Sequence, residues 1–262
     1  MKLSKTILTA ALLCAPAIAF SQSADEIAKK SHDLPDGNTS SMTAVLTLID
    51  KGGKSRQREV ASYGIKEGAV KKEVMVFRTP KDVAGVSYLT FDYPDNADGT
   101  PKDSDSWLYL PAMAKSRRVS GSSKDDDFQG TDFTYDDIGN RSLAKDTFAL
   151  LGQEKVDGAD CWILECTAKD KNAKISRRVF WIQKDNYVTR KGEYYDKTNK
   201  LKKELKCEDI TQISGYWVTK KMTMTNVQTG HKTVFESKDH KFDAPLDKNY
   251  FTVSALEREL LK

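Results

Sequence analysis

Histidine is scarce in this chain of 262 residues, which contains only His32, His231 and His240. None of them lies near a nucleophile motif. The strained turn Gly-x-Ser-x-Gly, which exposes the serine of many hydrolases, is also absent. The sequence therefore predicts that the protein is not an enzyme. A catalytic triad built from residues scattered along the chain stays open as the lesser alternative.

An excess of charge of either sign is missing too. The sequence has 42 lysines and arginines against 38 aspartates and glutamates, and two of the lysines fall within residues 1–19. A nucleic-acid-binding domain typically has a pI above about 9 and clustered basic residues. The near balance of charge over the rest of the chain therefore predicts no nucleic-acid partner.

Long hydrophobic runs do not occur after the N-terminal segment. The run Ile7–Ile18 is shorter than the ~20 apolar residues of a membrane-spanning helix. Lysines precede it, and Ala17 and Ala19 occupy the positions that a signal peptidase reads. We expect residues 1–19 to be a cleaved signal peptide and residues 20–262 to form a single domain in an oxidising compartment. A retained anchor or a lipidated Cys14 is disfavoured, because Leu13 is not the small residue expected before a lipidated cysteine.

Cysteine is also rare, and three cysteines remain after residue 19: Cys161, Cys166 and Cys207. An odd number leaves at least one thiol unpaired. Cys161 and Cys166 are five apart on an expected strand, so they point to opposite faces and cannot bridge each other. Their spacing matches no zinc pattern. Buried thiols are favoured over a disulfide to Cys207, and neither a metal nor a cofactor is predicted.

Most of the chain alternates apolar and polar residues with period two, which is typical of half-buried strands. The pattern begins near Ser41, where Met42, Ala44, Leu46 and Leu48 alternate with polar side chains. Six strands joined by short polar turns are expected in the second half: Cys161–Ala168, Ile175–Gln183, Tyr187–Tyr195, Leu201–Ile210, Tyr216–Asn226 and His231–Lys241. Hairpin-length links predict an antiparallel meander.

Few helices are available to cover these strands. Ala24–Ser31 reads as a short helix, and helical spacing returns only after Ser254. A sheet with one apolar face must bury that face. We therefore expect a mainly β (α+β) domain, in which a strongly curved antiparallel sheet encloses its own apolar face and a few short helices cap the concave side.

The segment Pro111–Phe148 interrupts the β pattern. It contains the basic cluster Lys115-Ser116-Arg117-Arg118, the acidic run Asp125-Asp126-Asp127 and a helical stretch expected from Tyr135 through Phe148. An interruption of that length inside a sheet protein is usually functional or disordered. The basic cluster is either a docking element for phosphate or carboxylate groups, or a solvated hairpin end. The acidic run is equally able to pair with it and hold the loop shut.

Four segments carry a likeness to a known family: Phe77–Gly85, Trp107–Pro111, Arg117–Val119 and Phe128–Phe133. In these segments the chain resembles the outer-membrane lipoprotein-sorting protein family, and the likeness extends over essentially all of the chain after residue 19. Its fold is similar to that of the periplasmic lipoprotein carrier LolA. The resemblance implies an unclosed antiparallel half-barrel in the periplasm, whose concave face is lidded by short helices and shelters acyl chains.

The function implied by the resemblance is that of a carrier, which binds lipid or lipoprotein acyl chains and transfers them between envelope membranes. Its partners would be an inner-membrane transporter, an outer-membrane acceptor or both, and the carrier itself is expected to be a monomer. A periplasmic regulator that senses lipid or misplaced lipoprotein with the same fold is the alternative. A lipid hydrolase ranks third, because its motif is missing.

Two sets of residues are predicted to form the site. The lipid-cavity candidates, taken as one apolar face from the alternation, are Leu46, Leu48, Val74, Val76, Tyr88, Leu108, Leu110, Trp162, Leu164, Trp181, Met222 and Met224. The candidates for a rim or gate are Lys115, Arg117, Arg118, Asp125, Asp126, Asp127, Phe128 and Phe133.

Overall fold

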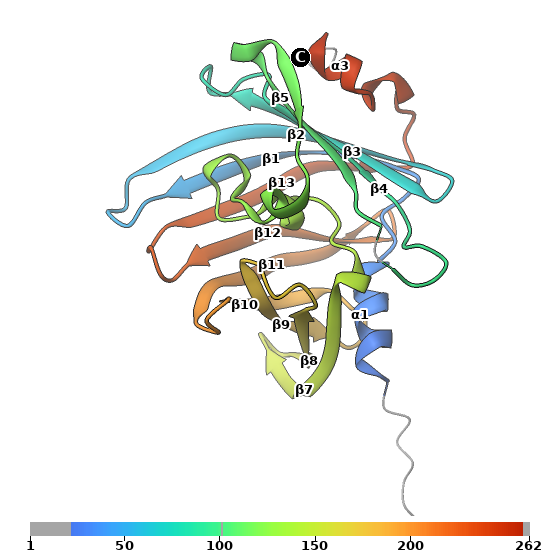
Figure 1. Cartoon of the computed structure of the whole chain (residues 1–262), viewed down its shortest axis with the longest axis vertical. Helices are drawn as coiled ribbons and strands as arrows, with labels where there is room; N and C mark the ends of the chain where they lie inside the picture. The colour runs from blue at the N-terminus through green and yellow to red at the C-terminus, as the bar shows by residue number, and fades with distance from the viewer. Residues whose placement is uncertain (1–21, 101, 259–262) are drawn as a thin grey trace, which may run out of the picture.

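One antiparallel sheet of thirteen strands makes up most of the protein (Figure 1). The computed structural model describes residues 22–100 and 102–258, so the expected signal peptide lies outside the described residues. The strands are β1 (Thr39–Ile49), β2 (Ser55–Glu67), β3 (Val70–Thr79), β4 (Ser87–Asp92), β5 (Asp105–Leu110), β6 (Lys115–Arg118), β7 (Asp146–Val156), β8 (Ala159–Ala168), β9 (Ile175–Gln183), β10 (Thr189–Asp196), β11 (Leu201–Ile213), β12 (Tyr216–Asn226) and β13 (Lys232–Phe242). Their order is β6-β5-β4-β3-β2-β1-β13-β12-β11-β10-β9-β8-β7, and the sheet does not close on itself. The predicted fold class is confirmed.

The first and last strands meet in the middle of the sheet. β1 pairs with β2 on one side and with β13 on the other. From this centre β2 to β6 run outward as one meander, and β12 back to β7 run outward as a second. Each arm needs only short turns, because sequential antiparallel strands are joined by hairpins. The long link between β6 and β7 then has to cross from one edge of the sheet to the other.

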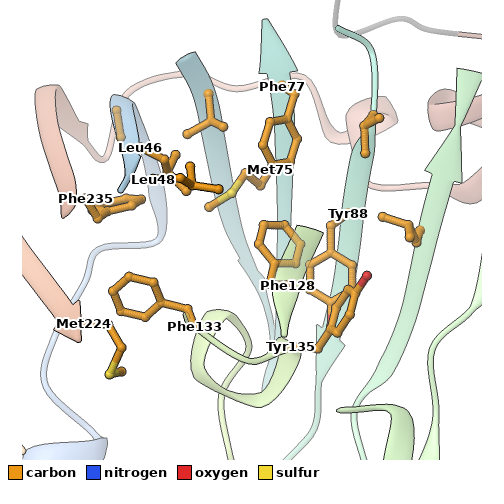
Figure 2. Packing of buried hydrophobic residues seen from close by; sticks show 14 of the residues in the cluster. Leu46, Leu48, Met75, Phe77, Tyr88, Phe128, Phe133, Tyr135, Met224 and Phe235 are labelled. Atoms are coloured by element: carbon orange, nitrogen blue, oxygen red, sulfur yellow. The ribbon is translucent and has the colours of Figure 1, made fainter. Parts of the chain in front are cut away.

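The concave face is the face that this long link covers. Alternate residues of each strand point to it, and the strand registers align them across the sheet. Leu46 lies opposite Phe235, Met75 opposite Tyr88, and Tyr88 opposite Leu108. Together with buried residues of the link, these side chains form the largest apolar cluster of the protein (Figure 2).

The link itself is mostly irregular. It contains 3₁₀ turns at Gly121–Asp125, Phe128–Gly130 and Leu143–Lys145, and the single-turn helix α2 (Tyr135–Ile138). Thr134 caps α2, because its hydroxyl accepts from the Asp137 amide while the Asp137 carboxylate accepts from the Thr134 amide. The helix expected from Tyr135 through Phe148 therefore begins where it was predicted, but its extent is wrong. Helix α2 ends at Ile138, and Asp146 already begins the edge strand β7, which was not predicted from the sequence.

Two helices at the ends of the chain cover other parts of the sheet (Figure 1). Helix α1 (Ala24–His32) begins with a capping box between Ser23 and Glu26, and it buries Ile27 and Ala28 against β8 and β9. The C-terminal helix α3 (Val253–Glu257) lies on the opposite, convex face beside β4 and β5. The convex face therefore has an apolar cluster of its own.

All three described cysteines are buried, and none of them forms a disulfide. Burial raises the pKa of the Cys166 thiol and of the Cys207 thiol to about 12. A thiol reacts as the thiolate, so these two side chains are chemically inert at neutral pH. The expectation of buried, unpaired thiols is confirmed.

Candidate functional site

A lid covers the concave face, and we define it as residues Asp126–Ile138. Its central apolar contact is Phe128, which is 0% exposed. The Phe128 ring centroid lies 5.8 Å from that of Phe77, 5.4 Å from Tyr88 and 5.2 Å from Tyr135. Figure 2 shows these rings together, with Phe133 turned toward Met224 and Phe235 on the other arm of the sheet. One short segment thus contacts both arms.

Polar groups fix the lid to β11 and β13. The Thr233 hydroxyl donates to the Asp132 carboxylate at 2.8 Å and accepts from the Asp132 amide at 3.0 Å. Nδ1 of His231 lies 2.7 Å from the same carboxylate. The Lys203 ammonium donates to the Asp132 carbonyl at 2.5 Å and to the Asp127 carboxylate at 2.8 Å. Lys203 is 1% exposed, so the lid supplies the partners that its buried charge requires.

A second anchor comes from β2, on the other side of the sheet centre. The Arg58 guanidinium donates to the carbonyl of Gln129 and lies over the Phe77 ring. Gln129 has a positive φ of 49°, a left-handed conformation that is uncommon for residues other than glycine. Side chains from both arms of the sheet thus hold the lid between Asp127 and Asp132.

A cavity of about 240 Å³ lies between the lid and the sheet. Its apolar walls come from both arms of the sheet and from the lid, including Met42, Met75, Leu205, Met222 and Phe133. The carboxylates of Glu73 and Asp137 and the hydroxyls of Ser62, Thr90, Tyr88 and Tyr194 also line it. The space is therefore mainly apolar, with polar groups contributed by both arms of the sheet and by the lid.

A second cavity of about 210 Å³ lies under α1, on the other side of Asp137. Leu164, Phe180 and Ile182 form its apolar floor. At its edge the Arg141 guanidinium donates to Asp136 at 2.8 Å and to both oxygens of Asp146 at 2.8 and 3.0 Å. Burial disfavours the charged form, but these hydrogen bonds and charges raise the pKa of Arg141 above its usual value.

The concave face becomes polar toward the end of β4. Asp92 is buried there, and its burial, together with the nearby Glu73 carboxylate, raises the pKa of Asp92 to about 7. Lys71 and Lys124 act in the opposite direction, but they do not offset the burial. Asp92 is therefore a carboxyl group that takes up and releases a proton near neutral pH.

Nine of the twelve predicted cavity residues share the concave face. Leu46, Leu48, Tyr88, Leu108, Leu110, Met222 and Met224 belong to the cluster under the lid, and Trp162 and Leu164 to the cluster under α1. Of these nine, Tyr88 and Met222 line the first cavity, and Leu164 lines the second.

Val74, Val76 and Trp181 do not share that face. Val74 and Val76 pack against the C-terminal segment on the convex side, and Trp181 lies in a separate outer cluster. In β3 the run Val74–Phe77 is buried on both faces, so alternation alone does not show which residues point inward. The expectation of a single apolar face is wrong for these three residues.

The predicted rim residues divide in a similar way. Phe128 and Phe133 are buried parts of the lid. Lys115 and Arg117 are exposed on the edge strand β6, and Arg118 forms an ion pair with Asp105. Of the acidic run, Asp126 forms an ion pair with Lys174, Asp127 pairs with Lys203, and Asp125 accepts the Lys174 amide. The acidic run thus pairs with the opposite arm of the sheet and not with the basic cluster, which corrects that alternative.

The sequence reading missed the buried charges. Arg58 and Lys203 point to the same side of their strands as the buried apolar residues Val60 and Leu205, two positions further along the chain. A charged residue at a strand position where the alternation places a core residue indicates a buried charge that has a partner. This signal was available from the alternation, but the partners lie 71 and more residues away in the chain.

Solved structures and a family model place the chain among known proteins. A family model described as an uncharacterized protein matches residues 69–258. A DUF1329 family protein from Desulfovibrio piger is 33% identical, with a TM-score of 0.81 over 89% of this chain and 97% of that one. A Vibrio parahaemolyticus domain described as an outer membrane lipoprotein-sorting protein is 30% identical, with a TM-score of 0.81 over 90% of this chain and 98% of that one. No curated protein matches.

A LolA superfamily protein from Nitrosomonas europaea has the same fold, with a TM-score of 0.67 at 18% identity over 88% of this chain and 98% of that one. The open sheet and its covered concave face therefore have the LolA-like fold. The chain belongs to the family represented by the two nearer structures, that of the DUF1329 and outer-membrane lipoprotein-sorting proteins. The resemblance in the sequence is confirmed. In residues 22–100 and 102–258, no helix is long and apolar enough to cross a membrane.

The pKa of Asp92 predicts a pH dependence of stability. In the folded protein the Asp92 carboxyl group keeps its proton until the pH reaches about 7, whereas in the unfolded chain it loses the proton near pH 4. The stability that the protonated group provides is therefore complete below pH 4 and is lost as the pH rises to 7, by roughly 3–4 kcal/mol. We expect Asp92→Asn to be more stable than the wild type at pH 8 and equal to it at pH 4 in urea titrations. A difference that stays constant with pH would contradict this.

Loss of the Lys203 contacts should loosen the lid. Lys203→Met keeps the packed stem but leaves the Asp132 carbonyl without its donor, at a cost of about 1–3 kcal/mol. We expect faster hydrogen exchange in residues 127–134, measured by mass spectrometry. Lys206→Met is the matched control, because Lys206 is exposed on the same strand and contacts Glu208. Equal exchange in both variants would show that Lys203 does not hold the lid.

Proposed function

We propose that this protein is a periplasmic carrier that binds lipid or lipoprotein acyl chains on its concave face and transfers them between envelope membranes. The observation that carries the proposal is a mainly apolar cavity between an open sheet and a lid that is anchored by a small set of polar contacts. The similarity to a lipoprotein-sorting domain supports it.

The energetics of such a carrier follow from burial. Each methylene removed from water is worth about 0.8 kcal/mol, so an acyl chain in the cavity does not leave into water quickly. Transfer then requires direct delivery to an acceptor that competes for the chain. An inner-membrane transporter or an outer-membrane acceptor would provide that step, and the exposed Lys115 and Arg117 at the sheet edge are candidate docking residues.

The size of the cavities indicates how cargo is accommodated. Each alone is smaller than the roughly 300–1,000 Å³ of usual ligand sites, whereas the two together fall within that range. They lie on either side of α2, which belongs to the lid. Loading therefore involves a displacement of the lid, which joins the two spaces.

A wider side chain in the first cavity should exclude the cargo. Met222 is partly buried and lines that cavity, so Met222→Trp is expected to lower the amount of co-purified lipid severalfold. Overpacking costs about 1–3 kcal/mol, which a melting curve would reveal. Lipid is extracted from the purified protein and quantified by mass spectrometry.

Two controls make this test decisive. Met113→Trp adds the same side chain at a position that is 66% exposed, and it should leave the lipid content unchanged. Met42→Trp tests the same cavity from β1 if the Met222 variant fails to fold. Unchanged lipid content in a folded cavity variant, or lipid-free wild-type protein, would contradict the proposal.

A further inference from the structure

Four cationic side chains are buried in the described part of the chain: Arg58, Lys124, Arg178 and Lys203. Three of them have hydrogen-bond acceptors. Arg58 donates to the Gln129 carbonyl, Lys124 to the carbonyl and hydroxyl of Ser104, and Lys203 to Asp127 and Asp132. The Arg178 side chain is only 4% exposed, and its Nη1 atom is buried with no hydrogen-bond partner among the described residues.

Arg178 points toward the concave face from the middle of β9. Its strand neighbours on that face are Cys166 of β8 and Tyr194 of β10, and its guanidinium lies 5.7 Å from the centroid of the Tyr194 ring. The Nη1 atom is buried without a partner. The side chain lines the second cavity, together with the apolar residues Leu164, Phe148 and Ile182.

The acidic residues of the same cavity form hydrogen bonds with groups other than Arg178. Asp136 and Asp146 both accept from Arg141, and the Asp137 carboxylate accepts from the Thr134 amide at the start of α2. These negative charges favour the positive charge of Arg178 at a distance, but none of the three carboxylates forms a hydrogen bond with it. A buried charge without a bonded partner is among the costliest groups in a protein, and such groups are normally paired.

The two cavities share a boundary near this arginine. Phe180 packs against the apolar clusters of both, and its ring meets that of Tyr194, which lines the first cavity, at a centroid distance of 5.8 Å. A ligand with an anionic group at Arg178 would thus have apolar space on both sides. A guanidinium presents a planar fork of donors that matches carboxylate and phosphate oxygens.

We propose that Arg178 anchors the anionic head of the cargo, a carboxylate or a phosphate, while the acyl chains occupy the two cavities. This inference rests on the proposed carrier function and narrows it to anionic amphiphiles. The missing partner of Arg178 is then a group of the ligand.

The experiment compares lipids that differ only in the head group. Binding to the purified, delipidated protein is measured for hexadecanoate against hexadecan-1-ol, and for dipalmitoyl phosphatidate against dipalmitoylglycerol. We expect the wild type to bind the anion of at least one pair about ten- to a hundredfold more tightly than its neutral partner, as for a hydrogen bond to a charged group. The pair of lipids that shows the preference identifies the anionic group as a carboxylate or a phosphate. Acetate and inorganic phosphate are measured as well, to test whether the anionic group binds without an acyl chain.

Arg178→Met should abolish this preference and leave the affinity for the neutral lipid unchanged. Arg177→Met is the matched control, because Arg177 precedes it on β9, points to the other face and pairs with Glu165 at 3.0 Å. The control should keep the preference. The melting temperature of Arg178→Met should equal or exceed that of the wild type, since it removes a buried charge that has no partner.

The outcomes separate this inference from the carrier function. A wild type that binds acid and alcohol equally, or an Arg178→Met variant that keeps the anion preference, overturns the role of Arg178 and leaves the carrier function intact. A marked fall in melting temperature in that variant also overturns it, since it would reveal a structural role. Failure of the wild type to bind any of the four lipids overturns the carrier function itself.

Discussion

The structure depends on the need to cover an apolar face that an open sheet cannot bury by itself. A closed barrel would fill its interior with its own side chains, whereas the thirteen strands here leave the concave face open to one side. The lid meets this need with very little chain. The packing of Phe128 against Phe77, Tyr88 and Tyr135 provides the apolar contact, and the space beside it is left as a cavity.

Buried polar groups hold this cover in place. Lys203 and Arg58 extend from opposite arms of the sheet to backbone carbonyls of the lid, so the closed lid supplies the acceptors of both buried charges. Opening the lid exposes these groups to water, which can replace their partners. The apolar faces gain no such compensation from water. In the proposed carrier, an acyl chain would replace the apolar contacts that the sheet loses when the lid opens.

The strand pattern of the fold was readable from the sequence, and much of the site was not. Alternation in Met42–Leu48 and in the second-half meander identified strands, because each buries one face. Alternation was ambiguous in Val74–Phe77, where both faces are buried, so Val74 and Val76 were placed on the wrong side. The lid anchors were beyond reach for another reason. Asp132 and Lys203 are 71 residues apart, and only the meeting of the two meanders brings them together.

The most direct test of acyl-chain binding on the concave face is to locate the chain in the folded protein. A brominated fatty acid quenches the fluorescence of a nearby tryptophan, and this chain carries suitable reporters on both faces. Trp162 lies on the concave face under α1, whereas Trp107 and Trp181 lie in clusters on the outer side. In variants that retain one of these tryptophans at a time, we predict quenching of Trp162 and none of Trp107 or Trp181. Quenching of the two outer tryptophans with Trp162 unaffected would contradict it.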